Sequence, residues 1–139
     1  MIVQLRRGPE PAPRRDDMTA PDFERLGGEA GVRAVVDAVL DRVFADAMIG
    51  FYFDRAPKAR IRELEARFAM AHLGGPDTYD GRPLDVAHAP HRIFDGHFAR
   101  RIAILRETLV EVAVPADVAA RWVAHAEAQR AHIVVAACR

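Results

Sequence analysis

Apolar residues recur from residue 22 onward with the three- and four-residue spacing of α-helices, and no stretch alternates as a β-strand would. Glycine pairs and prolines separate these periodic segments and end them. The pattern predicts five helices, over residues 22–26, 29–45, 57–73, 95–111 and 115–137. We therefore expect an all-α fold in one domain that covers residues 22–139.

One connection between the predicted helices is unusually long. It runs from Gly74 to Asp95, about twenty residues, which is more than packed helices normally need and favours a functional segment. The connection contains a short apolar stretch over 84–89 that includes His88. Pro90 prevents a helix from continuing far beyond that histidine.

Residues 1–21 differ in composition from the rest of the chain. They hold four of the nine prolines, two arginine pairs and an acidic pair at positions 16 and 17. Such a segment buries little apolar surface, so we expect a disordered N-terminal tail; a short docking arm is the alternative.

Composition and charge exclude several classes of function. The 20 basic and 20 acidic side chains balance, which argues against binding to nucleic acid or to anionic membranes. No apolar run reaches the roughly 18 residues of a membrane span, and no apolar segment follows the N-terminal arginines as in a secretory signal. The only cysteine, Cys138, cannot form an internal disulfide. We expect a cytoplasmic protein.

Histidine is the main candidate for chemistry. A single histidine on a short segment beside a pocket, as His88 would be, can bind an iron atom; a hydrogen-bonded surface or core histidine is the alternative. Zinc binding by His88, His91 and His97 is a weaker interpretation, because the sequence offers no clear fourth ligand.

The other three histidines fit ordinary helix positions. His72 ends a predicted helix, where the helix dipole favours a cation. His125 and His132 lie seven residues apart on the last predicted helix, so they share a face, and we expect both to be partly exposed.

Glu65 is anomalous, because it lies on the apolar face of its predicted helix, four residues after Ile61 and three before Phe68. A buried carboxylate is unfavourable unless it is paired or protonated. It either pairs with Arg62 or another arginine, or it is a pocket acid whose pKa is raised by burial.

Several short motifs follow one another in the order of a known family. They are Phe-Glu-Arg-Leu-Gly-Gly-Glu at 23–29, Phe-Tyr-Phe at 51–53, Leu-Gly-Gly-Pro at 73–76, Tyr-Asp-Gly-Arg at 79–82, Ala-His-Ala-Pro-His-Arg-Ile at 87–93 and His-Phe at 97–98. In this order and spacing the chain resembles the truncated haemoglobins, most closely group I, with some features of group II.

The resemblance implies a truncated globin fold, a two-over-two helical sandwich around one haem. It implies His88 as the axial ligand of the iron, and haem b held without a covalent bond, because the chain has no Cys-x-x-Cys-His motif. The expected cofactor-binding residues are His88, Phe53, Phe68, Leu40, Ile61, Glu65, Leu64 and Ile93. Lys58, Arg60 and Arg62 are candidate partners of the haem propionates.

The side of the pocket opposite His88 departs from the family pattern. Leu40 stands where group I proteins commonly have a tyrosine, and Glu65 stands where they commonly have a glutamine. Arg101 occupies a position that is bulky and apolar or aromatic in some relatives. The usual hydroxyl and amide donors to bound oxygen are therefore missing, so carbon monoxide binding should be less affected than oxygen binding.

The resulting expectation is a haem-binding globin that takes up a diatomic gas (O2, CO or NO). A haem-based redox enzyme of the peroxidase or nitric-oxide dioxygenase type, served by a separate reductase, is the alternative. A haem-free sensor or interaction module is the third interpretation.

Overall fold

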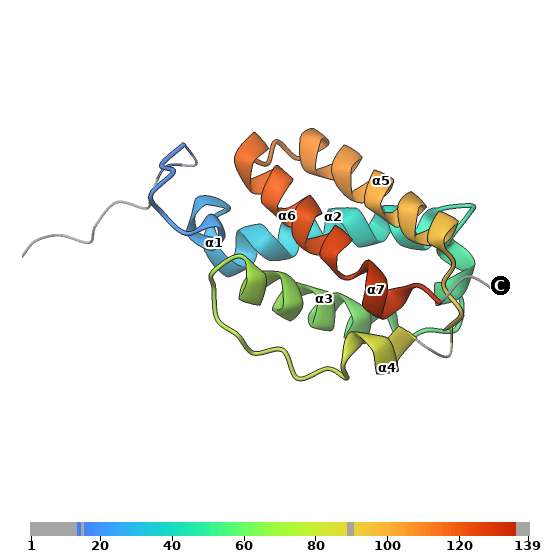
Figure 1. The fold of residues 1–139 in the computed structure, drawn as a ribbon. Helices are drawn as coiled ribbons and strands as arrows, with labels where there is room; N and C mark the ends of the chain where they lie inside the picture. Colours follow the sequence, from blue (N-terminus) through green and yellow to red (C-terminus); the bar gives the residue numbers. More distant parts are fainter. Residues whose placement is uncertain (1–13, 15, 89–90, 136–139) are drawn as a thin grey trace, which may run out of the picture.

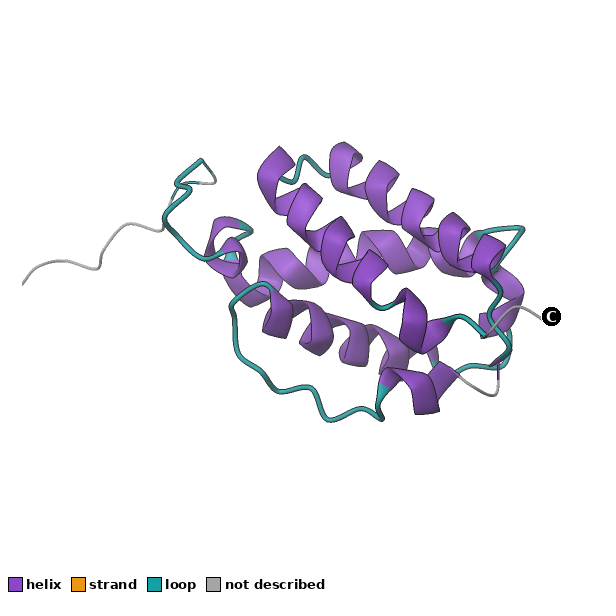
Figure 2. Ribbon diagram, viewed as in Figure 1, coloured by secondary structure: helices purple, strands orange, loops and turns teal. Residues whose placement is uncertain are grey.

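The computed structural model describes residue 14 and residues 16–88 and 91–135. Most of the expected disordered tail lies outside these residues. The helices are α1 (Asp22–Arg25), α2 (Gly28–Ala45), the 3-10 helix η1 (Gly50–Phe53), α3 (Lys58–His72), α4 (Leu84–His88), α5 (Asp95–Glu111), α6 (Ala116–Ala128) and α7 (Arg130–Ile133). The described residues contain no β-sheet, only an isolated bridge between Ile93 and Val134 (Figure 2).

Two antiparallel helix pairs form the body of the molecule (Figure 1). Helix α2 packs against both α3 and α5, and α5 packs against α6. The apolar stripes predicted from the sequence meet between these pairs. The most deeply buried side chains there include Val32, Leu40 and Val43 of α2, Leu109 of α5 and Val118 of α6. Burial of each such side chain stabilises the fold by about 1.5–3 kcal/mol.

Glycines let α1 turn sharply into α2. Gly27 has φ of +94°, in the left-handed region that residues with a side chain rarely adopt. One turn later, a Cβ atom on Gly31 would overlap the carbonyl oxygen of Leu26. These glycines therefore allow α1 and α2 to lie in close contact.

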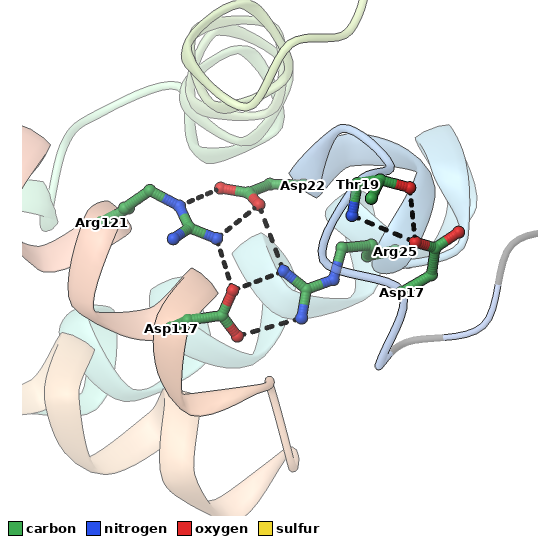
Figure 3. A network of polar contacts seen from close by, with 6 residues as sticks. All are labelled: Asp17, Thr19, Asp22, Arg25, Asp117 and Arg121. Atoms are coloured by element: carbon green, nitrogen blue, oxygen red, sulfur yellow. Dashed lines mark hydrogen bonds and ion pairs between the residues drawn. The ribbon is translucent and has the colours of Figure 1, made fainter.

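A polar network fastens α1 to α6 (Figure 3). The guanidinium of Arg25, 2% exposed, donates to both carboxylate oxygens of Asp117, at 2.5 and 3.0 Å. Arg121 donates to Asp22 at 2.8 Å and to Asp117 at 2.6 Å. The two guanidinium groups hold the pKa of Asp117 well below its usual range. The buried charge of Arg25 is thus fully paired.

The predicted last helix is wrong in its length and continuity. It is divided at Gln129, whose backbone N–H donates to Ala126 while its side-chain amide donates to the carbonyl of His125. The helical ladder therefore breaks between α6 and α7. Helix α7 ends before Val134, and the extended backbone there pairs with Ile93 instead.

Candidate functional site

Helix α3 presents two different inner faces. Ala66, Ala69 and Met70 are fully buried in the core. The second face carries Ile61, Leu64, Glu65 and Phe68, spaced as on one side of a helix, and all four are only half-buried. This face contacts α5 through Glu65 and α6 through Phe68. The residues that the sequence singled out on α3 are therefore gathered on one surface.

His88 is the last residue of α4, the short helix within the long connection between α3 and α5 (Figure 1). Its Nδ1 lies 2.7 Å from the carbonyl oxygen of Leu84. A carbonyl only accepts, so Nδ1 carries the proton and Nε2 keeps its free lone pair. Burial is the largest effect on this imidazole and lowers its pKa, which favours the neutral ring that binds metal ions.

Glu65 forms an ion pair with Arg101 of α5, at 2.7 Å between Oε1 and Nη2. The two side chains are 35% and 32% exposed. Both charges act on His88: Arg101 lowers the pKa of the imidazole and Glu65 raises it. Arg62 is not the partner, because it pairs with Asp37 and Asp41. The expectation that another arginine would pair with Glu65 is confirmed.

Aromatic rings line the neighbouring parts of this surface. Phe53 of η1 is half-buried and packs against Phe44, with ring centroids 5.0 Å apart. Phe68 meets the rings of Tyr79 and His125, each at 5.4 Å. Leu40, by contrast, is buried in the core at 1% exposure.

His72 stacks on His125, with ring centroids 4.0 Å apart and planes 15° from parallel. Trp122 and Phe68 approach the His72 ring at 5.6 and 6.1 Å. Burial lowers the pKa of His72 to about 4, and His125 adds to the effect. The expectation of a favoured cation here is wrong, because burial outweighs the helix dipole.

The segment after His88 is held from two sides. The Tyr52 hydroxyl donates to the carbonyl of Arg92 at 3.1 Å and lies 3.0 Å from Nδ1 of His97. Ile93 is half-buried against the core, and its carbonyl accepts from Val135 at 2.9 Å. The sequence did not indicate this anchoring, because Tyr52 lies 40 residues away from Arg92.

The three candidate propionate partners all have protein partners. Lys58 donates to the carbonyl of Phe53 at 2.9 Å. Arg60 reaches Asp80 at 3.5 Å, and Arg62 is held by the two aspartates of α2.

The zinc interpretation also involved the two histidines that follow α4 in the sequence. His91 is exposed and His97 is engaged by Tyr52. Among the described residues, no group of three histidine, cysteine or carboxylate side chains could hold a metal ion.

Within the part of the chain that the structure describes, no helix is long and apolar enough to cross a membrane.

Comparisons with known proteins give one consistent result. The family model described as bacterial-like globin matches residues 22–134. The group 1 truncated hemoglobin of Synechocystis is 34% identical over 110 residues, which cover 76% of this chain and 89% of that protein.

Solved structures agree with the sequence relatives. A mutant of the truncated hemoglobin of Tetrahymena pyriformis superposes with a TM-score of 0.78 at 26% identity, covering 84% of this chain and 100% of that one. The 2/2 hemoglobin of Synechococcus, with covalently attached heme, gives 0.73 at 28% identity, covering 78% and 91%. The expected two-over-two helical fold is confirmed.

Proposed function

Because this chain belongs to the bacterial-like globins, as a truncated haemoglobin, we propose that it binds one haem b and takes up a diatomic gas. In this proposal His88 is the axial ligand of the iron. The observation that carries it is the bond between Nδ1 of His88 and the carbonyl of Leu84. It fixes the tautomer and leaves Nε2 available as a ligand.

Half-buried apolar side chains fit a flat apolar cofactor. Phe53, Ile61, Leu64, Phe68 and Ile93 are apolar but only half-buried, and they come from the elements on either side of α4 in the sequence. Such side chains can cover the faces of haem and exclude water from it. Leu40 is buried deeper in the core and would lie behind these side chains.

Bound haem would supply an iron atom that can coordinate a small gas. Leu40 and Ile61 have no group that donates a hydrogen bond to such a gas. Glu65 and Arg101 form a charged pair beside these apolar residues. We therefore expect a mostly apolar pocket with one charged pair at its side, which favours carbon monoxide relative to oxygen.

The attachment of haem is proposed to be non-covalent. The chain contains no Cys-x-x-Cys-His motif. Extraction with acidified butanone should therefore remove the haem completely, in contrast to the covalently attached heme of the Synechococcus relative.

A redox enzyme is the second candidate function. Its support is the Glu65 carboxylate, which Arg101 orients beside the pocket and which can accept a proton at Oε2. Such an enzyme needs an electron donor, so a separate reductase would be its partner. Turnover of peroxide or nitric oxide with an added donor distinguishes it from a simple gas carrier.

Absorption spectra test the axial ligand. We would reconstitute wild type, His88→Ala and His91→Ala with haemin and record ferric, reduced and carbon monoxide forms. His91 is the matched control because it is an exposed histidine three residues away. We expect a sharp Soret band that shifts with carbon monoxide in wild type and His91→Ala, and its loss or alteration in His88→Ala. Spectra like free haemin in all three would contradict the proposal.

A further inference from the structure

An arginine lies within the apolar stripe of α5. Arg101 follows Phe98 by three residues and precedes Leu105 by four, and these two neighbours are 3% and 7% exposed. Residues at this spacing share one helix face, so the stem of Arg101 starts from the inner side of α5. Glu65 has the equivalent position on α3, between Ile61 and Phe68.

Arg101 uses little of its hydrogen-bonding capacity. Its Nη2 donates to Glu65, and in the described part of the chain its guanidinium has no other hydrogen-bond partner. A guanidinium carries five N–H donors, so four of them form no hydrogen bond with the described residues. The adjacent Arg100 differs, because both Nε and Nη2 of that residue donate to Asp46.

Stability alone does not explain this pair. Its side chains are 32% and 35% exposed, and an ion pair so accessible to water contributes only about 0–1 kcal/mol. Glu65 belongs to the same half-buried face of α3 as Ile61 and Phe68, so its partner Arg101 lies beside the proposed pocket.

We infer that Arg101 is an anion-recognition group of this pocket, held in place by Glu65, and that it strengthens the binding of small monoanions to the ferric haem protein. The inference rests on the proposed function, because the pocket would be the one that holds haem. Glu65 orients the guanidinium through one hydrogen bond and partly balances its charge. The remaining N–H groups of Arg101 donate to the anion.

Anion titrations of the ferric haem protein test the inference. Fluoride and azide are the probes, followed by the change in the Soret band, and carbon monoxide binding to the reduced protein is the neutral comparison. Losing a charge-assisted hydrogen bond weakens binding roughly ten- to a hundred-fold, so the Kd for both anions should rise by this factor in Arg101→Leu. Carbon monoxide affinity should change by less than about three-fold, since it accepts only weak hydrogen bonds.

Two further variants sharpen the result. Glu65→Gln removes the competing carboxylate, so its Kd for fluoride and azide should fall several-fold. Arg106→Leu is the matched control, because Arg106 is an exposed arginine on the same helix. It removes the same charge and should leave both constants unchanged.

Three outcomes would overturn the inference. They are equal anion affinity in Arg101→Leu and wild type, an equal loss in Arg106→Leu, or an equal loss of carbon monoxide affinity in Arg101→Leu. A double variant, Glu65→Leu with Arg101→Leu, should unfold at the same urea concentration as wild type or a higher one; a large loss of stability would make the pair structural. A normal His88-dependent Soret band with unchanged anion affinities would refute only this inference, whereas absence of that band would refute the proposed function as well.

Discussion

Acidification from pH 6.5 to 4.5 should destabilise this protein through His72. This imidazole is enclosed by His125, Trp122 and Phe68, and burial lowers its pKa from 6.5 to about 4. The folded protein therefore binds fewer protons at this site than the unfolded chain, which titrates near 6.5. The stabilising effect is complete above pH 6.5 and declines as the pH falls toward 4.

The magnitude follows from the two pKa values. At pH 4.5 the unfolded chain is almost fully protonated at His72 and the folded protein only in part, a difference of about 2.5 kcal/mol in unfolding free energy. Carboxylates contribute at lower pH. The pKa of Glu63, for example, is lowered to about 2 by Arg33 and Arg67, so its contribution is lost mainly below about pH 4.5. The window from 6.5 to 4.5 thus isolates the histidines.

Urea unfolding of wild type and His72→Phe, followed by circular dichroism, measures this effect. Phenylalanine keeps an aromatic ring against His125 but cannot titrate. Wild type should lose about 2 kcal/mol more than the variant between pH 6.5 and 4.5, because the unfolded chain is already half protonated at pH 6.5. The exposed His132 provides the control variant, His132→Phe, which should behave as wild type. Equal losses in wild type and His72→Phe would refute the reasoning.

Three other substitutions test the packing of the helices by urea unfolding at pH 7. Gly31→Ala should cost at least about 2 kcal/mol, although alanine normally favours helices, because its Cβ would overlap the carbonyl of Leu26; unchanged or higher stability would contradict this. Arg25→Met should cost about 1.5–3 kcal/mol by removing the charged hydrogen bonds to Asp117, which keeps Arg121, and a loss below 1 kcal/mol would contradict it. Tyr52→Phe should cost about 1 kcal/mol and speed amide exchange in the segment after α4, and unchanged exchange would contradict the anchoring.

Sequence reasoning located the helices because apolar spacing and glycine or proline boundaries are local signals. The helix over residues 95–111 coincides with α5, and α2 begins one residue earlier than expected. The prediction of the last helix was wrong because the break depends on the Gln129 side chain. The end of the helix depends on the pairing of Val134 with Ile93, which is a tertiary contact.

The candidate site was likewise predictable from the sequence only in part. That Glu65 would need a partner followed from its position in an apolar stripe, but the choice of Arg101 over Arg62 depends on how α3 crosses α5. The stack of His72 on His125 likewise joins two residues that are 53 positions apart in the chain, and no local sequence pattern indicates it. Helix position could suggest a favoured charge at His72, whereas burial, which decides the outcome, could only be seen in the fold.

The pairing of Arg25 with Asp117 also sets an order for folding. These residues are 92 positions apart, and the N-terminal half of a chain leaves the ribosome first. Until α6 has been synthesised, Asp117 is not available to neutralise Arg25 of α1. Burying the charge of Arg25 without this partner is strongly unfavourable. Closing so long a loop also carries an entropic cost that only the complete set of contacts offsets. Formation of the ion pair between α1 and α6 is therefore a late event in synthesis.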